Sequence, residues 1–328
     1  MSFVSAEPRA ARVAQVRAGG YRRHAIHGDE RTWIETNCYT DLVVEMLHAL
    51  GHEPLAMLAY TVAIDFEGDQ WTFFKPPTGD LLELYGVDVQ ELAIWRPVLD
   101  HVVEQVSGGR IVMVELDAFH LPDTAGTAYG LTHQKTTVGV NEIDPERGFL
   151  GYFHNQGYYE LEGEDFRRLF DIQGLPPFAE LVKVLPEFPA PRGQALVQAS
   201  VAKLTREIAH APRENPFPRF RKRLVADLDS LLGSDLERFH KYSFATLRQY
   251  GACFELAQSY LAWLAGNGVA GLEVPAASFG RIAQAGKAFQ FQLARAMSRK
   301  KPLELAPLDD MAAQWDIATT LLRSRYAN

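Results

Sequence analysis

The sequence contains few cysteines and no long apolar run. Its 328 residues include only Cys38 and Cys253, which argues against a disulfide scaffold and fits a reducing compartment. Neither cysteine belongs to a Cys-x-x-Cys pair, so zinc ribbons and thioredoxin-type motifs are excluded. No stretch approaches eighteen apolar residues, and the amino terminus lacks the apolar core of a secretory signal. We therefore expect a cytoplasmic protein without a membrane partner.

The signatures of nucleotide and nucleic-acid binding are also missing. Gly-rich pieces such as Ser107–Gly109 precede a strand instead of following one, which is the wrong order for a phosphate-binding loop. The net charge of −8 disfavours non-specific binding to nucleic acid, and no recognition-helix or aromatic-platform motif is present. We therefore expect no nucleic-acid partner.

The length and the hydrophobic pattern predict two domains after a short arm. Residues 1–30 are interpreted as a polar arm, in which His24 and His27 are solvated. Residues 31–188 mix helical and strand patterns and end in a Pro-rich linker. Residues 189–328 are helical almost throughout. The predicted fold is an α+β domain followed by an all-α helical bundle.

Several elements can be predicted from periodicity. Cys38, Leu42 and Met46 recur at helical spacing, Thr36 or Asn37 can cap this helix, and the helix stops near Gly51. The remaining patterns predict helices over 92–106, 164–170, 236–264, 278–297 and 308–325, and strands over 111–116, 134–143, 149–153, 158–161 and 181–185.

Cys38 is the first candidate for chemistry. It stands in the first turn of its helix, where the helix dipole and free backbone N–H groups favour a thiolate and can stabilise an oxyanion. The alternative is a small buried side chain, as is common for free cysteines and as we expect for Cys253.

A thiol nucleophile needs a base, and the base needs a residue that orients it. His133 precedes the Thr- and Val-rich strand over 134–143, where its side chain can face a cleft. Asn155, or its neighbour His154, follows the next strand and can fix the imidazole tautomer. The order Cys, His, Asn along the chain is that of papain-like enzymes.

The block from Val112 to Pro122 reads VMVELDAFHLP and is followed by Tyr129, His133 and a valine-rich strand. It resembles the amino-terminal domain of the butirosin-type aminoacyl-carrier-protein acyltransferases. That family is similar to the double-glycine leader peptidases and so to the papain-like fold. The whole sequence, including NCYTDLVVEMLHALGHEP and GYFHNQGYYELEGEDF, also looks like a bacterial conserved-domain family of about this length.

The resemblance implies a papain-like cysteine-protease-type domain that transfers an aminoacyl group. The donor would be the phosphopantetheine thioester of an acyl or aminoacyl carrier protein, and the acceptor a small-molecule or peptide amine, with no bound cofactor. Cys38 would take the acyl group, His133 would carry the proton and Asn155 would orient His133. The sequence departs from the family at His120, where an aromatic residue is usual, and at His154–Asn155, where an Asp is expected.

Other polar residues in this block allow alternative roles. Asp117 follows a buried strand and can either hold a substrate ammonium group or act as a turn residue. With His120, His133 and His154 it also forms a set of zinc or iron ligand types. No spacing in this set fixes a coordination geometry, so we expect no metal.

The carboxy-terminal half carries a local excess of positive charge. Between residues 190 and 223 there are eight Lys and Arg against two Glu, including the cluster Arg219, Arg221, Lys222 and Arg223. Carrier proteins are usually acidic, so this cluster can dock one. The alternative is a solvated helical face.

Three functions therefore remain open. The first is the acyltransferase with an acyl-cysteine intermediate. The second is a cysteine hydrolase, namely a peptidase, amidase or thioesterase, on the same residues. The third is a non-catalytic protein that binds a carrier protein.

Overall fold

The structure is a computed structural model that describes residues 11–34, 36–299 and 302–326. The chain forms two compact units. Among the described residues, the first contains those up to His27, Asn37–Pro54 and Thr78–Ala190, and the second contains those within Gly28–Thr36, Leu55–Pro77 and from Pro191 onward. The sequence-based division into 31–188 and 189–328 did not assign 28–36 and 55–77 to the helical unit.

The first unit is built on an antiparallel sheet in the order β2-β7-β3-β4-β5-β6, and β1 pairs with the end of β4 that β3 leaves free. All five predicted strands are confirmed to within two residues, whereas β1 and β2 were not predicted. The strands are β1 (Ala11–Arg12), β2 (Val87–Glu91), β3 (Ile111–Asp117), β4 (Lys135–Asp144), β5 (Phe149–His154), β6 (Gly157–Glu162) and β7 (Ala179–Val184).

One face of the sheet carries the main hydrophobic core of the first unit. Alternate residues of β3 and β4 point into this core, where they meet α3 (Val98–Ser107) and α4 (Glu164–Leu169). The predicted helix over 92–106 begins only at Val98. The residue before Pro97 is disfavoured in a helix, and the backbone N–H of Leu92 instead donates to the carbonyl of Ala179 at 2.8 Å, extending the sheet.

The opposite face is crossed by α1 (Cys38–Ala49), the helix that the sequence predicted. The Asn37 side chain caps it by accepting a hydrogen bond from the backbone N–H of Thr40 at 2.8 Å. One turn into the helix Leu42 packs over Gly139, where a β-carbon would be 3.5 Å from the leucine side chain. At the start of the helix the Tyr39 hydroxyl donates to Glu180 Oε2 of β7 at 2.8 Å, and Glu180 and Gly139 both pair with Met113 of β3.

Residues 11–27 are packed on the first unit and are not a solvated arm. Residues 1–10 of the predicted arm lie outside the described part of the chain. His27 is fully buried beside α1, where its ring nitrogens bond to Asp41 and Glu45. Burial alone would lower the pKa of His27, but the hydrogen bonds to these two carboxylates raise it.

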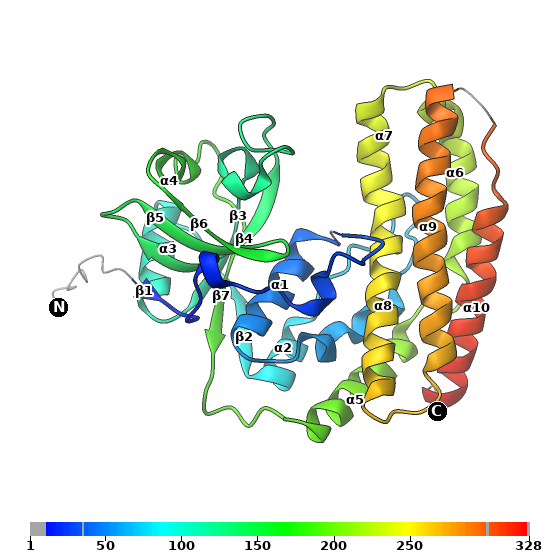
Figure 1. Cartoon of the computed structure of the whole chain (residues 1–328), viewed down its shortest axis with the longest axis horizontal. Helices are drawn as coiled ribbons and strands as arrows, with labels where there is room; N and C mark the ends of the chain where they lie inside the picture. The colour runs from blue at the N-terminus through cyan, green and yellow to red at the C-terminus, as the bar shows by residue number, and fades with distance from the viewer. Residues whose placement is uncertain (1–10, 35, 300–301, 327–328) are drawn as a thin grey trace. The chain divides into compact units, whose positions relative to one another are not determined.

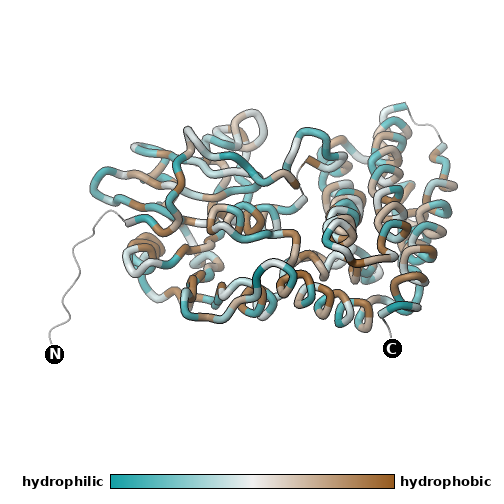
Figure 2. The backbone as a smooth tube through the Cα atoms, turned by 60° about the horizontal axis from the view of Figure 1, so that its bottom comes forward, coloured by the Kyte–Doolittle hydropathy of each residue, from teal (hydrophilic) through white to brown (hydrophobic). Residues whose placement is uncertain are grey.

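The second unit is the predicted helical domain. In the described residues its helices α6, α8, α9 and α10 run alongside one another (Figure 1), and Figure 2 shows apolar and polar stretches alternating along them. The predicted helix over 236–264 continues from α7 to α8 through a short π-helical segment at Phe244–Arg248. The helices are α5 (Gln194–His210), α6 (Pro216–Leu232), α7 (Leu236–Ser243), α8 (Gln249–Gly266), α9 (Glu273–Arg299) and α10 (Ala306–Tyr326).

Of the remaining helical segments in the described residues, two are longer than three residues. The short helix α2 (Thr78–Tyr85) leads into β2 in the first unit, and residues Pro54–Ala63 form a 3₁₀ helix. No helix in the described ranges is long and apolar enough to cross a membrane.

Candidate active site

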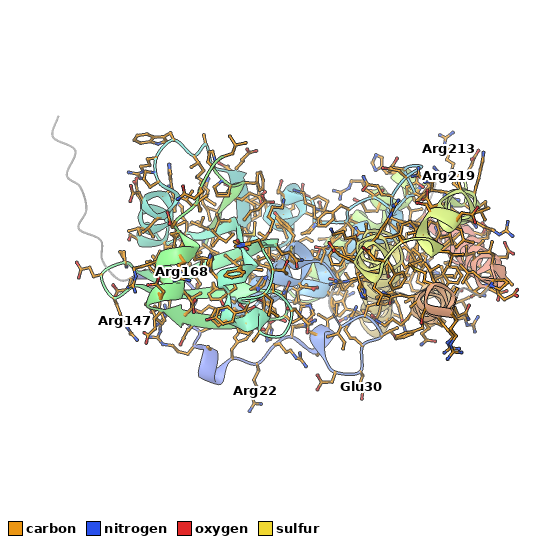
Figure 3. All side chains as sticks on the ribbon, turned by 90° about the horizontal axis from the view of Figure 1, so that it is seen from above. Arg22, Glu30, Arg147, Arg168, Arg213 and Arg219 are labelled. Carbon is orange, nitrogen blue, oxygen red and sulfur yellow. The ribbon has the colours of Figure 1, made fainter. Side chains whose placement is uncertain are left out.

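A pocket of about 610 Å³ opens where β3 ends and β4 begins, on the first unit. One wall comes from the segment that joins these two strands, and the other from the stretch after α4. Arg168 extends from α4 into this lining and is labelled in Figure 3. The lining mixes apolar groups with charged ones, comprising Glu115, Leu116, Asp117, His120, His133, Gln134, Lys135, Arg168, Leu169, Asp171, Ile172, Gln173 and Pro177.

The centre of the pocket wall is a hydrogen-bonded pair, Asp117 and His133. The register pairs Asp117 with Lys135, so the residue two positions before Lys135 comes to lie beside the end of β3. His133 Nδ1 donates to Asp117 Oδ2 at 2.6 Å, since an ionised carboxylate can only accept. The other oxygen, Oδ1, accepts the backbone N–H groups of Phe119 and Gln134 at 3.0 and 3.2 Å. Asp117 is thereby held by three donors.

These donors decide the charge state of Asp117. Partial burial would raise the pKa of this carboxyl, but the hydrogen bond from His133 and the two backbone N–H bonds outweigh it and lower the pKa. Asp117 therefore stays ionised at neutral pH and fixes the proton of His133 on Nδ1. The second nitrogen, Nε2, is left with the lone pair that a general base requires.

The His133 ring is further held by stacking. It lies parallel to the ring of Phe119, with centroids 4.4 Å apart and an interplanar angle of 12°. The ring of His120 stands edge-on to that of His133, at 6.5 Å. Although the side chain of His133 is 73% exposed, its orientation is set from two sides, by Asp117 and by Phe119.

The sequence assigned the orienting role to Asn155, and the structure gives His133 a different partner. Asn155 lies in the turn between β5 and β6, where its φ of +46° is a left-handed conformation that Asn tolerates better than most residues. His154, the other residue considered, is buried and bonded to Asp123 and Thr136. Asp117, predicted as a substrate or turn residue, takes the place beside His133.

Cys38 is half-buried at the start of α1, on the same side of the sheet as Asp117. Strand alternation places Asp117 on the same face as Met113, which pairs with the Gly139 that Leu42 of α1 covers. Asp117 lies four residues along β3 from Met113, which is about 13 Å at 3.3 Å per residue. Cys38 does not line the pocket, and no hydrogen bond joins it to His133 in the described part of the chain.

In the part of the chain that the structure describes, no group of three or more His, Cys, Asp or Glu side chains is arranged to hold a metal ion. In the basic cluster, three of the four side chains pair with carboxylates. Arg219, labelled in Figure 3, bonds to Asp65, and the other two ion pairs join Arg221 to Asp309 and Arg223 to Asp227. These pairs reduce the charge that the cluster presents.

The sequence matches a known family in two consecutive parts. Residues 22–184 match the DUF1839 N-terminal domain, and residues 193–324 match the DUF1839 C-terminal domain. The gap between the two matches contains Ala190, the last residue of the first structural unit. No curated protein matches the chain.

Proposed function

This chain belongs to the DUF1839 family, and we propose that it is an acyltransferase whose general base is His133, oriented by Asp117. The observation that carries the proposal is this pair itself. Asp117 fixes the tautomer and ring of His133 at the edge of a pocket large enough for an acyl group and part of its carrier arm.

The proposed donor is an aminoacyl thioester on the phosphopantetheine arm of an acidic carrier protein, and the proposed nucleophile is Cys38. Its thiolate attacks the thioester carbonyl. The carbonyl carbon then forms a bond to the Cys38 sulfur, and its bond to the pantetheine sulfur breaks. Pantetheine leaves as a thiolate that takes a proton from solvent. The papain-like architecture is part of this proposal, supported by a helix that begins with Cys38 and packs on an antiparallel sheet.

The second half of the reaction uses the pair in the pocket. An acceptor amine attacks the acyl-cysteine carbonyl, and Nε2 of His133 takes the amine proton as the new C–N bond forms. The Cys38 sulfur leaves as a thiolate. Asp117 stabilises the imidazolium of His133 through Nδ1, and solvent later removes the extra proton. The apolar wall of the pocket, which includes Leu116 and Ile172, is suited to the acyl side chain.

The test uses an aminoacyl-pantetheine thioester with a primary amine and follows both product and intact protein mass. We expect wild type to show an aminoacyl mass increment and to form the amide. Cys38→Ser should form neither at the wild-type rate. Cys253→Ser is the matched control, because this second thiol is fully buried in the helical unit, where burial raises its pKa.

A second function, hydrolysis or aminolysis of the thioester without an acyl-enzyme, is favoured by one observation. His133 lines the pocket and Cys38 does not. In that reaction His133 would deprotonate water or the amine directly. Turnover that persists in Cys38→Ser and is lost in His133→Ala would establish this route and refute the cysteine route.

A further inference from the structure

The segment between β3 and β4, residues 118–134, carries the two histidines of the pocket, His120 and His133, and also Phe119, on which His133 stacks. It is closed on itself, since the backbone N–H of Gly130 donates to the carbonyl of Phe119 at 3.0 Å. The Thr124 hydroxyl also donates to the carbonyl of Ala118 at 2.9 Å. The position of His133 therefore depends on how this whole segment is fixed to the sheet.

Asp123 supplies such a fixed point. Its Oδ1 accepts the hydroxyl of Tyr152 at 2.5 Å, and its Oδ2 accepts Nδ1–H of His154 at 2.6 Å. Both partners belong to β5. The chain continues to β4, because the Thr136 hydroxyl is 2.7 Å from His154 Nε2 and can donate to it. One carboxylate thus ties the segment to two strands.

The hydrogen bonds of Asp123 and His154 are buried. The side chains of His154 and Asp123 are 1% and 3% exposed, so water cannot replace either partner. Both ring nitrogens of His154 are occupied, and both oxygens of Asp123 have donors. The network lies on the core face of the sheet, because Tyr152 belongs to that hydrophobic cluster. Asp117 and α1 are on the other face, so the network cannot contact the reacting atoms directly.

We propose that Asp123 and His154 are positioning residues, which hold the 118–134 segment so that His133 stays bonded to Asp117. This rests on the proposed role of His133 as a base. It gives His154 an indirect role, fixing the base through Asp123, in place of the direct contact with His133 that the sequence suggested. The four hydrogen-bonded side chains of Asp123, His154, Thr136 and Tyr152 are called the anchor.

The test compares Asp123→Ala with the conservative Asp123→Asn. Asparagine can keep the anchor, because its oxygen accepts from His154 and its amide N–H can donate to the Tyr152 oxygen. Alanine removes it. The first readout is the pKa of the Asp117 carboxyl by ¹³C NMR. We expect it to rise toward the ordinary value of about 3.9 in Asp123→Ala and to stay low in Asp123→Asn. The second readout is kcat against KM, with a fall of about tenfold or more in kcat for Asp123→Ala only.

The matched control is Asn141→Ala. Asn141 is also buried, lies on the same strand β4 and anchors a different segment, since it bonds to both the N–H and the carbonyl of Ala14. It should leave the Asp117 pKa and kcat unchanged. If Asp123→Ala does not fold, Tyr152→Phe removes one donor only and should shift both readouts in the same direction.

A folded Asp123→Ala protein with an unchanged Asp117 pKa would overturn the positioning role. So would Asn141→Ala, if it moved that pKa equally. The NMR readout needs no turnover, so it remains informative even where the acyltransferase proposal fails. A wild-type protein without activity, combined with a shifted Asp117 pKa in Asp123→Ala, would refute the function and keep the anchor.

Discussion

Replacing Asp117 by Asn changes one oxygen to an amide nitrogen, and the surroundings decide which way that amide turns. One carboxylate oxygen, Oδ1, accepts from the backbone N–H groups of Phe119 and Gln134. The other oxygen, Oδ2, accepts from Nδ1 of His133. Backbone N–H groups can only donate. The amide oxygen must therefore face the backbone, and the amide NH₂ must face the imidazole.

This orientation forces His133 into the other tautomer. Nδ1 must accept from the amide, so the proton moves to Nε2. A neutral imidazole with its proton on Nε2 cannot accept a proton from a substrate at that atom. General bases contribute about 10²- to 10⁴-fold, and we expect a fall in kcat within that range for Asp117→Asn. The stability should change by less than about 1 kcal/mol, because the pair is exposed to solvent.

The assay measures amide formation from an aminoacyl-pantetheine thioester, alongside urea unfolding of each variant. Glu162→Gln is the control, because it removes the same charge from an exposed ion pair with Arg147 in the first unit. It should keep the wild-type rate. Asp117→Asn with an unchanged kcat would refute the tautomer argument. A large loss of stability would instead show that Asp117 acts as a structural cap.

Two further predictions concern stability. His27 has a raised pKa between two acidic side chains of α1, so its contribution is fully present below about pH 6.5 and is lost as the pH rises through the folded-state pKa. His27→Gln should flatten this alkaline decline in urea unfolding, and an unchanged pH profile would contradict the ion pairing. In α8, Gly251→Ala places a β-carbon 2.4 Å from the Trp33 ring and should cost about 1–3 kcal/mol, whereas Gly266→Ala, with open space around it, should cost nothing. Equal thermal stability of the two glycine variants would be inconsistent with that packing.

Local patterns were sufficient to predict much of the first unit. Alternating Thr and Val residues predicted β4, and the helical spacing from Cys38 predicted α1 together with its Asn37 cap. Each of these features is determined within about ten residues of sequence. The same holds for the placement of His133 before a strand. The edge strands β1 and β2 were missed, because two to five residues give too short a pattern.

The partners of the histidines could not be predicted in the same way. Asp117 lies 16 residues from His133 along the chain. The two residues meet only through the β3–β4 register, which cannot be read from the sequence alone. A signal was available, however. An acid at the end of one strand and a histidine at the start of the next antiparallel strand must come close. His27 gave no signal, because it sits in a polar stretch and its partners lie 14 and 18 residues away.

The proton balance of the two steps leads to a final prediction about their order. Acylation of Cys38 exchanges one thiolate for another and needs no general base, whereas the attacking amine must lose a proton as the amide forms. We therefore expect acylation of Cys38 to proceed without His133, and amide formation to depend on it. His133→Ala should then accumulate the aminoacyl form of Cys38, seen as a persistent increment in intact mass, while amide formation falls by about 10²-fold or more. A His133→Ala protein that is never acylated would mean that the imidazole already serves the thiol in the first step.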